Sequence, residues 1–316
     1  MINFADRLLA RIAQLDNPTV MGLDPMLEYI PASLVEQARK DSDGPLESAG
    51  TAIAVFNRRL IDCVADIIPA VKPQLAYYEQ YGVPGIEAFH ETCAYARQKG
   101  MLVIADGKRN DIGTTASAYA RAYLGETTFW DQDLRTVHDV DALTINPYLG
   151  SDGIDPFLEQ CRLHGKGVFI LVRTSNPSAG DFQDLTLADG RTLYEAVADQ
   201  VDRWGASLTG DSGFSSAGAV VGATYPEQAA LLRRRMPNAL ILVPGYGAQG
   251  ATADDCVHNF DSQGRGAIVN ASRSLMLAYK KHQLPQEAFD EACWLEALQM
   301  KKALNQAIAK HCDQNV

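Results

Sequence analysis

Short apolar runs bounded by glycine, proline or acidic residues recur along the chain. They are rich in valine and isoleucine and do not alternate with polar residues, which is typical of parallel strands that are buried on both faces. The pattern predicts eight strands, at residues 19–23, 70–72, 101–105, 142–145, 168–172, 219–222, 240–243 and 267–269.

Segments of helical period follow these runs. One segment has a single apolar face, which consists of Ile53, Phe56, Leu60, Val64 and Ile67. A final amphipathic stretch spans residues 285 to about 308. Eight strand–helix units favour an α/β fold. We predict a single (β/α)8 TIM barrel over residues 1–316, with its active site at the carboxyl ends of the strands. A doubly wound open sheet is the alternative, and the absence of a GxGxxG motif after the first strand counts against it.

Three polar stretches interrupt this repeat, near residues 28–50, 125–137 and 176–190. We expect them to be loop insertions in the barrel. Connections of this length usually serve a function, so we place all three between a strand and the following helix, on the side of the barrel that carries active sites.

Composition and charge narrow the classes of ligand. The formal charge of −11 gives no field that would attract nucleic acid or an anionic membrane, so an anionic ligand needs a few local cations. The six cysteines form no CxxC pair and the six histidines form no HExxH motif, so neither a metal site nor a redox dithiol is predicted. Because the sequence shows no signal-peptide core and no apolar run of about 18 residues, we expect a cytoplasmic protein that binds no membrane.

Charged residues lie where several predicted strands end. Asp106 and Lys108 follow the third strand, Lys72 ends the second, and Asp24 follows the first. In a barrel these positions meet at one mouth, where paired acids and bases can acquire the shifted pKa values that proton transfer needs. The alternative is a set of solvated turns, but independent turns would not place an ionisable residue at the end of strand after strand.

Polar, glycine-containing segments follow the last two predicted strands. Residues 243–250 read VPGYGAQG, and residues 270–274 read NASRS. Glycines let backbone N–H groups approach an anion closely, and an arginine adds a bidentate contact. Barrels often bind phosphate with these two loops, so we predict a phosphate site here that includes Arg273. The candidate substrate-binding residues of the two loops are Pro244, Gly245, Gly247, Gln249, Ser272 and Arg273.

Residues 104–115, which read IADGKRNDIGTT, resemble the DxKxxDIxxT signature of the orotidine 5′-phosphate decarboxylase family. The resemblance extends through further segments in the same order: GLDP at 22–25, VKPQ at 71–74, TSNPSA at 174–179, VPGYGAQG at 243–250 and SRS at 272–274. These segments cover most of the chain from about residue 19 to 275. The long connections are similar to those of the longer, bacterial type 2 branch.

The resemblance implies decarboxylation of orotidine 5′-phosphate to UMP in pyrimidine biosynthesis, without a cofactor or a metal. Asp106 would lie beside the departing carboxylate of the substrate. Lys108 would protonate C6 as the carbanion develops, and Lys72 would complete the charge array and hold Asp106.

The resemblance also implies a homodimer in which each subunit completes the site of its partner, through Asp111, Ile112 and Thr115. Within one subunit Asp24 would contact the ribose hydroxyls and Ser175 the pyrimidine. Gln249 and Arg273 would bind the phosphate.

Two alternatives to this function are open. A magnesium-dependent decarboxylase of 3-keto-L-gulonate 6-phosphate, from the same suprafamily, shares the DxK core but carries an acidic residue near the position of Lys72. A lysine there would repel a divalent cation. The second alternative is a barrel that binds phosphate without catalysis, and intact Asp106, Lys108 and Asp111 count against it.

Overall fold

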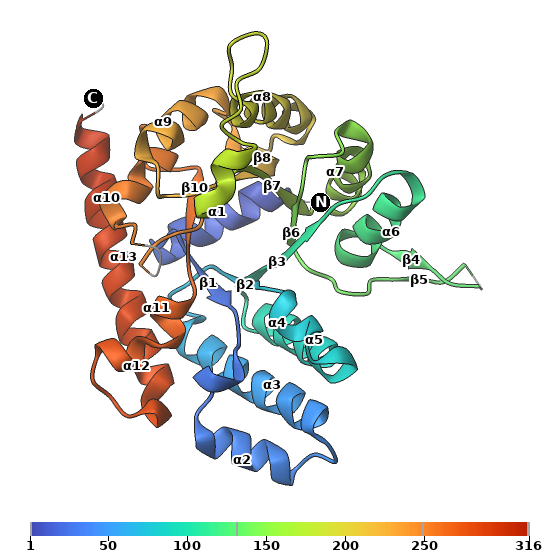
Figure 1. The fold of residues 1–316 in the computed structure, drawn as a ribbon, viewed down its shortest axis with the longest axis vertical. Helices are drawn as coiled ribbons and strands as arrows, with labels where there is room; N and C mark the ends of the chain where they lie inside the picture. The colour runs from blue at the N-terminus through green and yellow to red at the C-terminus, as the bar shows by residue number, and fades with distance from the viewer. Residues whose placement is uncertain (1, 131, 248–249, 315–316) are drawn as a thin grey trace.

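The computed structural model describes residues 2–130, 132–247 and 250–314, and its centre is a closed barrel of parallel strands (Figure 1). Around the barrel the strands follow the order β1, β10, β9, β8, β7, β6, β3, β2, so the first and last strands pair and close the sheet. Their bounds are β1 (Thr19–Leu23), β2 (Ala70–Pro73), β3 (Leu102–Arg109), β6 (Ala142–Ile145), β7 (Gly167–Arg173), β8 (Ser215–Val221), β9 (Ala239–Val243) and β10 (Ala267–Ala271). The predicted (β/α)8 TIM barrel is confirmed, and each predicted run overlaps one of these strands.

Strand β3 is longer than the apolar run that predicts it. It continues past Ala105 to Arg109 and includes Asp106 and Lys108. An unpaired charge is costly to bury, which is why a charged residue usually marks the end of a buried strand. Here the acid and the bases bond to one another at the mouth, so the strand can continue through them.

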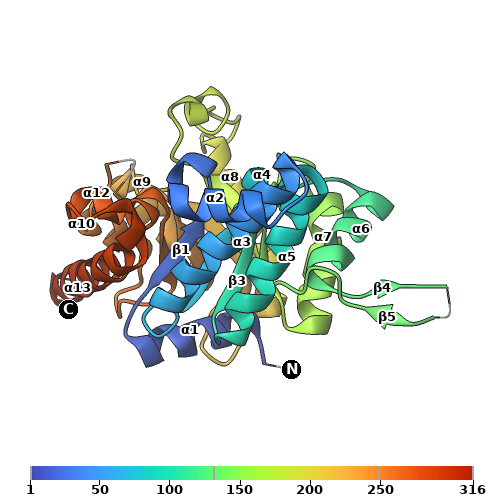
Figure 2. The same cartoon turned by 90° about the horizontal axis from the view of Figure 1, so that it is seen from below.

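Helices surround the barrel and cover the outer faces of its strands (Figure 1 and Figure 2). The longer ones are α3 (Pro45–Val64), α5 (Gly82–Gln98), α6 (Gly113–Leu124), α7 (Ser151–His164), α8 (Leu193–Gly205), α9 (Pro226–Arg235) and α13 (Phe289–Gln314). Shorter helices are α2 (Ala32–Lys40), α4 (Ala76–Glu79), α10 (Ala253–Cys256), α11 (Arg273–Met276) and α12 (Ala278–Lys281). The predicted apolar face of α3 packs inward, since Ile53, Phe56 and Leu60 are fully buried. Within the described ranges, no helix has the length and apolar character needed to cross a membrane.

Helix α1 (Phe4–Leu15), which the strand–helix repeat does not predict, closes the amino end of the barrel. Asn3 caps it, and its side chain accepts a hydrogen bond from the N–H of Ala5 at 2.7 Å. Phe4 is fully buried, and its ring lies edge-on to the ring of Phe169 from β7, with the centroids 6.0 Å apart. With Leu8, these rings belong to the core inside the barrel, on the side away from the mouth.

Two of the three polar stretches differ from the loops that we expected. Residues 28–50 follow β1 but contain α2 and the start of α3, so this insertion is largely helical. Residues 125–137 contain an antiparallel hairpin of β4 (Thr127–Thr128) and β5 (Leu134–Arg135) that projects from the body of the molecule (Figure 2). This hairpin joins α6 to β6, so the expectation that it follows a barrel strand is wrong, because polar composition marks an insertion without showing which element precedes it. Residues 176–190 do follow a strand, β7.

We expect Phe4→Ala to lower the free energy of unfolding by about 3–5 kcal/mol, because it removes a fully buried ring and leaves a cavity beside Phe169. Urea unfolding followed by circular dichroism measures the change. The control is Ile2→Ala: Ile2 is 68% exposed, so its loss should change the free energy by less than about 0.5 kcal/mol. Equal effects of the two substitutions would contradict the role of α1 in closing the barrel.

Candidate active site

Three charged side chains meet at the mouth of the barrel, where β2 and β3 end, and we call Lys72, Asp106 and Lys108 the Lys–Asp–Lys cluster. The buried carboxylate of Asp106 accepts a hydrogen bond from each ammonium group. Lys72 Nζ donates to Oδ2 and Lys108 Nζ donates to Oδ1, both at 2.6 Å. The side chain of Lys72 is 7% exposed and that of Lys108 is 46% exposed. One lysine is therefore enclosed with the acid, and the other faces the open mouth.

These contacts fix the charge state of the buried acid. Burial alone would raise the pKa of Asp106, but the positive charges of Lys72 and Lys108 outweigh burial and hold that pKa well below its usual range. Burial alone would lower the pKa of Lys72, but the negative charges of Asp106 and Asp24 outweigh burial and raise it. At neutral pH the mouth therefore holds an ionised acid directly beside an ionised lysine.

Two neutral side chains complete the hydrogen bonding of this carboxylate, and neither was among the predicted site residues. Gln74 Nε2 donates to Asp106 Oδ2 at 3.0 Å, and Thr144 Oγ1 donates to Asp106 Oδ1 at 2.8 Å. Thr144 is 1% exposed and is the polar residue of the otherwise apolar strand β6. A threonine in such a run is a weak sequence signal, and Gln74 directly follows β2 in the VKPQ segment.

Other strand ends carry buried polar atoms that have no hydrogen-bond partner among the described residues. They are Asp24 Oδ1 after β1, Thr224 Oγ1 after β8, Asn270 Oδ1 on β10 and Ser274 Oγ on α11. Buried polar atoms in folded proteins are usually paired, so unpaired atoms around a mouth are suited to a polar ligand. Asp24 was predicted from its place at a strand end. The other three were not, because the sequence does not distinguish an unpaired hydroxyl or amide from a paired one.

The glycine-rich loop after β9 and the turn after β10 lie against each other. Gly245 and Gly247 have φ angles of 114° and 70°, which glycine adopts without the strain that a side chain would cause. A Cβ built on Gly247 would lie 3.3 Å from the Cβ of Ser274, so the two loops are in contact. Pro244 begins the first loop directly after β9. Arg273 is exposed and pairs with no acid of the described chain, which leaves its guanidinium available to an anion.

Two of the predicted serines pack against glycines that lie in or directly after a neighbouring strand. A Cβ on Gly22 would lie 1.9 Å from Ser272 Oγ, and a Cβ on Gly222 would lie 2.9 Å from Ser175 Cβ. Both serines are therefore held at the mouth by a close approach to the backbone. Gln249, which we predicted as a phosphate contact, lies outside the described residues.

Asp111, Ile112 and Thr115 lie at and just before the start of α6. Asp111 Oδ1 accepts a hydrogen bond from the N–H of Ile112 at 2.8 Å. The side chain of Ile112 is 53% exposed, and Thr115 is also exposed. In the described part of the chain, none of the three forms a hydrogen bond or an ion pair with the Lys–Asp–Lys cluster. The fold of one chain therefore leaves them outside the cluster.

Two arginines near the mouth stabilise the fold. Arg109 ends β3 and forms an ion pair with Glu79 at the end of α4. Arg173 ends β7, is 3% exposed, donates to Gln228 Oε1 at 2.8 Å and pairs with Asp184 Oδ2 at 3.3 Å. Each guanidinium therefore ties a strand end to a neighbouring segment.

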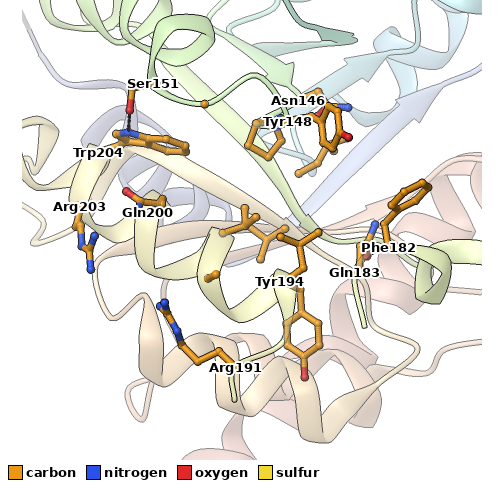
Figure 3. Close-up of a pocket in the computed structure, with 17 residues that line it drawn as sticks. Asn146, Tyr148, Ser151, Phe182, Gln183, Arg191, Tyr194, Gln200, Arg203 and Trp204 are labelled. Atoms are coloured by element: carbon orange, nitrogen blue, oxygen red, sulfur yellow. Dashed lines mark hydrogen bonds between the residues drawn. The ribbon is translucent and has the colours of Figure 1, made fainter. Parts of the chain in front are cut away.

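A groove of about 860 Å³ lies between α7 and α8 and the connections that precede them (Figure 3). Aromatic side chains line part of it, including Tyr148, Phe182 and Trp204. Trp204 Nε1 donates to Ser151 Oγ at 3.2 Å across the groove wall. No member of the Lys–Asp–Lys cluster lines this groove, so the charged chemistry lies in the barrel mouth and not here.

Comparison with known proteins shows the family. The model of the orotidine 5′-phosphate decarboxylase / HUMPS family matches residues 51–287, a segment that includes the whole Lys–Asp–Lys cluster. The chain belongs to this family. The resemblance inferred from the sequence motifs is confirmed.

Relatives of nearly equal length carry the same family name. The orotidine 5′-phosphate decarboxylase of Caldicellulosiruptor saccharolyticus is 42% identical over 309 residues, which cover 98% of this chain and 100% of the relative. That of Rhodopirellula baltica is 45% identical over 301 residues, which cover 94% and 96%. The crystal structure of a candidate orotidine-monophosphate decarboxylase from Toxoplasma gondii is 28% identical, with a TM-score of 0.78 and 99% of each chain covered. The similarity to the family therefore extends over the whole barrel.

We expect Asp106→Asn to lower the free energy of unfolding at pH 7 by about 3–5 kcal/mol, because it removes the carboxylate that is paired directly with the buried ammonium of Lys72. Since the pKa of Asp106 is depressed, its stabilising effect is present above the unfolded-state pKa of about 4 and is lost as the pH falls through the folded-state pKa. The difference between wild type and variant should therefore hold from about pH 8 to 5 and narrow below about pH 4. Urea unfolding at a series of pH values measures it.

Asp133→Asn is the matched control for this prediction, because Asp133 also pairs with a cation, Arg135, but is 47% exposed. Its loss should change the free energy of unfolding by less than about 1 kcal/mol. A difference for Asp106→Asn no larger than that of the control would contradict the assignment of Asp106 as a buried ionised acid.

Proposed function

We propose that this protein decarboxylates orotidine 5′-phosphate to UMP and CO2, with Lys108 as the proton donor. The observation that carries the proposal is the Lys–Asp–Lys cluster, in which one ammonium is enclosed and the other is half exposed at the mouth. Membership in the orotidine 5′-phosphate decarboxylase / HUMPS family and the names of the full-length relatives support the choice of substrate. The protein is then a carboxy-lyase that uses its own side chains and no cofactor.

The two lysines have different roles in this mechanism. When the bond between C6 and the substrate carboxylate breaks, CO2 leaves and the electron pair remains on C6. The exposed ammonium of Lys108 stabilises this charge and donates a proton to C6, and the neutral amine then regains a proton from water. Lys72 is enclosed and bonded to Asp106, so it completes the charge array and holds the acid in place.

Asp106 acts as a fixed negative charge. Its depressed pKa keeps it ionised, so it is not a source of protons. Placed beside the substrate carboxylate it repels the bound substrate, and the repulsion disappears when CO2 leaves. Its hydrogen bond to Lys108 Nζ also sets the direction of the donor.

The rest of the nucleotide fits the polar groups around the mouth. Asp24 is assigned to the ribose hydroxyls and Ser175 to the pyrimidine. The phosphate is assigned to the loops after β9 and β10, through Pro244, Gly245, Gly247, Gln249, Ser272 and Arg273. Binding energy from a phosphate far from C6 can close the loops after β7 and β9 around the reacting centre and so accelerate the distant step.

The same proposal includes a homodimer with shared sites. Ile112 and Thr115 are exposed, and with Asp111 they lie outside the cluster of their own chain, as residues that complete a neighbour's site would. The chain acts as one barrel domain with three insertions. Its six free cysteines suit the reducing cytoplasm, where we place the protein.

The two alternative functions fit the mouth less well. Both oxygens of Asp106 already accept hydrogen bonds from ammonium groups, and two positive charges beside it would repel the magnesium ion of a sugar-phosphate decarboxylase. A barrel that only bound phosphate would gain nothing from a buried acid held between two lysines, which is costly to desolvate.

We expect Lys108→Ala to lower kcat by about 10³-fold or more, because it removes both the proton donor and the charge that stabilises the carbanion. The loss of orotidylate ultraviolet absorbance measures turnover, and UMP binding should remain measurable by calorimetry. Wild-type turnover should be unchanged by EDTA.

Lys302→Ala, an exposed lysine of α13, is the control and should turn over like the wild type. Near wild-type turnover in Lys108→Ala would remove the assigned proton donor. Activity only on a sugar phosphate with magnesium would replace the substrate.

We expect Asp111→Ala and Lys108→Ala to complement each other when mixed. Each variant alone should be nearly inactive, but a mixed dimer contains one site that carries both changes and one site that carries neither. Random exchange of equal amounts should restore about a quarter of wild-type activity, since half of the dimers are mixed and each has one intact site. No recovery after subunit exchange, verified by native mass spectrometry, would contradict shared sites.

A further inference from the structure

Strand β3 is irregular where it carries the charged residues. In its ladder with β6, residue 105 pairs with residue 143 and residue 109 pairs with residue 145. Asp106, Gly107 and Lys108 therefore all lie opposite one residue of β6, Thr144. A bulge of this kind interrupts the backbone ladder and re-aims side chains, and bulges are common beside active sites. The backbone groups inside it need other partners.

The hydroxyl of Thr144 replaces a missing ladder bond. Its Oγ1 accepts a hydrogen bond from the backbone N–H of Lys108 at 3.0 Å and donates to Asp106 Oδ1 at 2.8 Å. Because the N–H can only donate, the hydroxyl proton is directed to the carboxylate. The same Oδ1 accepts a hydrogen bond from Lys108 Nζ. One hydroxyl therefore closes a ring of hydrogen bonds through both charged residues.

Lys108 is held in a backbone conformation that it would not adopt alone. Its φ is 45°, in the left-handed region that residues with a Cβ occupy at a cost. Strain of this kind persists only where the surrounding contacts enforce it. Thr144 is 1% exposed, so the hydroxyl that holds the Lys108 N–H is fixed in the barrel core.

We propose that Thr144 is a positioning residue for the decarboxylation. Its hydroxyl holds the backbone of Lys108 in the bulge and orients the carboxylate of Asp106, so that the ammonium of Lys108 points to the substrate carbon. Thr144 acts through these two residues and does not contact the substrate. The inference rests on the proposed function, because it assigns a role within that reaction.

Thr144→Val tests this role, because valine keeps the branched shape of threonine and removes the hydroxyl. Thr144→Ser keeps the hydroxyl and removes the methyl group. Thr19→Val is the matched control, since Thr19 is a fully buried threonine of β1 whose hydroxyl has no hydrogen-bond partner within the described residues. The melting temperature of each variant separates a loss of folding from a loss of positioning.

We expect kcat for orotidylate to fall about 10- to 100-fold in Thr144→Val, because a misplacement of a catalytic group by about an ångström has an effect of this size. KM and the Kd of UMP should stay within about threefold, since the binding contacts remain. Thr144→Ser and Thr19→Val should keep kcat within about threefold of the wild type.

A wild-type kcat in Thr144→Val, or a loss that Thr144→Ser shares, would overturn the positioning role. Failure of the wild type to act on orotidylate would contradict the proposed function instead. In that case the crystal structure of Thr144→Val decides: a Lys108 φ outside the left-handed region supports the inference, and an unchanged bulge overturns it.

Discussion

A carboxylate enclosed at the mouth of a barrel must keep its negative charge, and the rest of the site depends on how that charge is held. Asp106 receives hydrogen bonds from two ammonium groups, an amide and a hydroxyl. Two of these partners, Lys72 and Thr144, lie 34 and 38 residues away along the chain. Parallel strands bring their carboxyl ends to one rim, so a closed barrel assembles these distant groups without a flexible loop.

The unequal exposure of Lys72 and Lys108 makes the Lys–Asp–Lys cluster suitable for a reaction as well as for stabilising the fold. If both ammonium groups were enclosed, the cluster would only stabilise the fold. If both were exposed, the carboxylate would be screened by water and its electric field weakened. The structure combines one lysine of each kind. Lys72 is enclosed in the barrel mouth, whereas Lys108, in the bulge of β3, is half exposed, and both are bonded to Asp106.

Much of the fold and of the charged site can be predicted from the sequence because both leave strong local signals. Buried parallel strands appear as apolar runs, and an ionisable residue at the end of such a run is conspicuous, as Lys72 and Asp106 are. The role of Thr144 cannot be predicted from its own segment, because it depends on a bulge in the neighbouring strand. That bulge becomes visible only when the pairing of the two strands is known. Helix α1 is not predicted either, because a helix that closes the end of the barrel does not belong to the strand–helix repeat. Polar composition predicts the insertion at residues 125–137 but does not show that it follows a helix, at the amino end of the barrel.

The position of that hairpin allows its surface to change independently of the charged site. It leaves the chain between α6 and β6, toward the amino end of the barrel, whereas every charged group of the site lies at the carboxyl end. A core that includes Phe4 and Phe169 fills the space between the two ends. The length and the sequence of the hairpin can therefore change during evolution without displacing a catalytic atom. New surface features can arise at the amino end of the barrel while the chemistry at the carboxyl end stays the same.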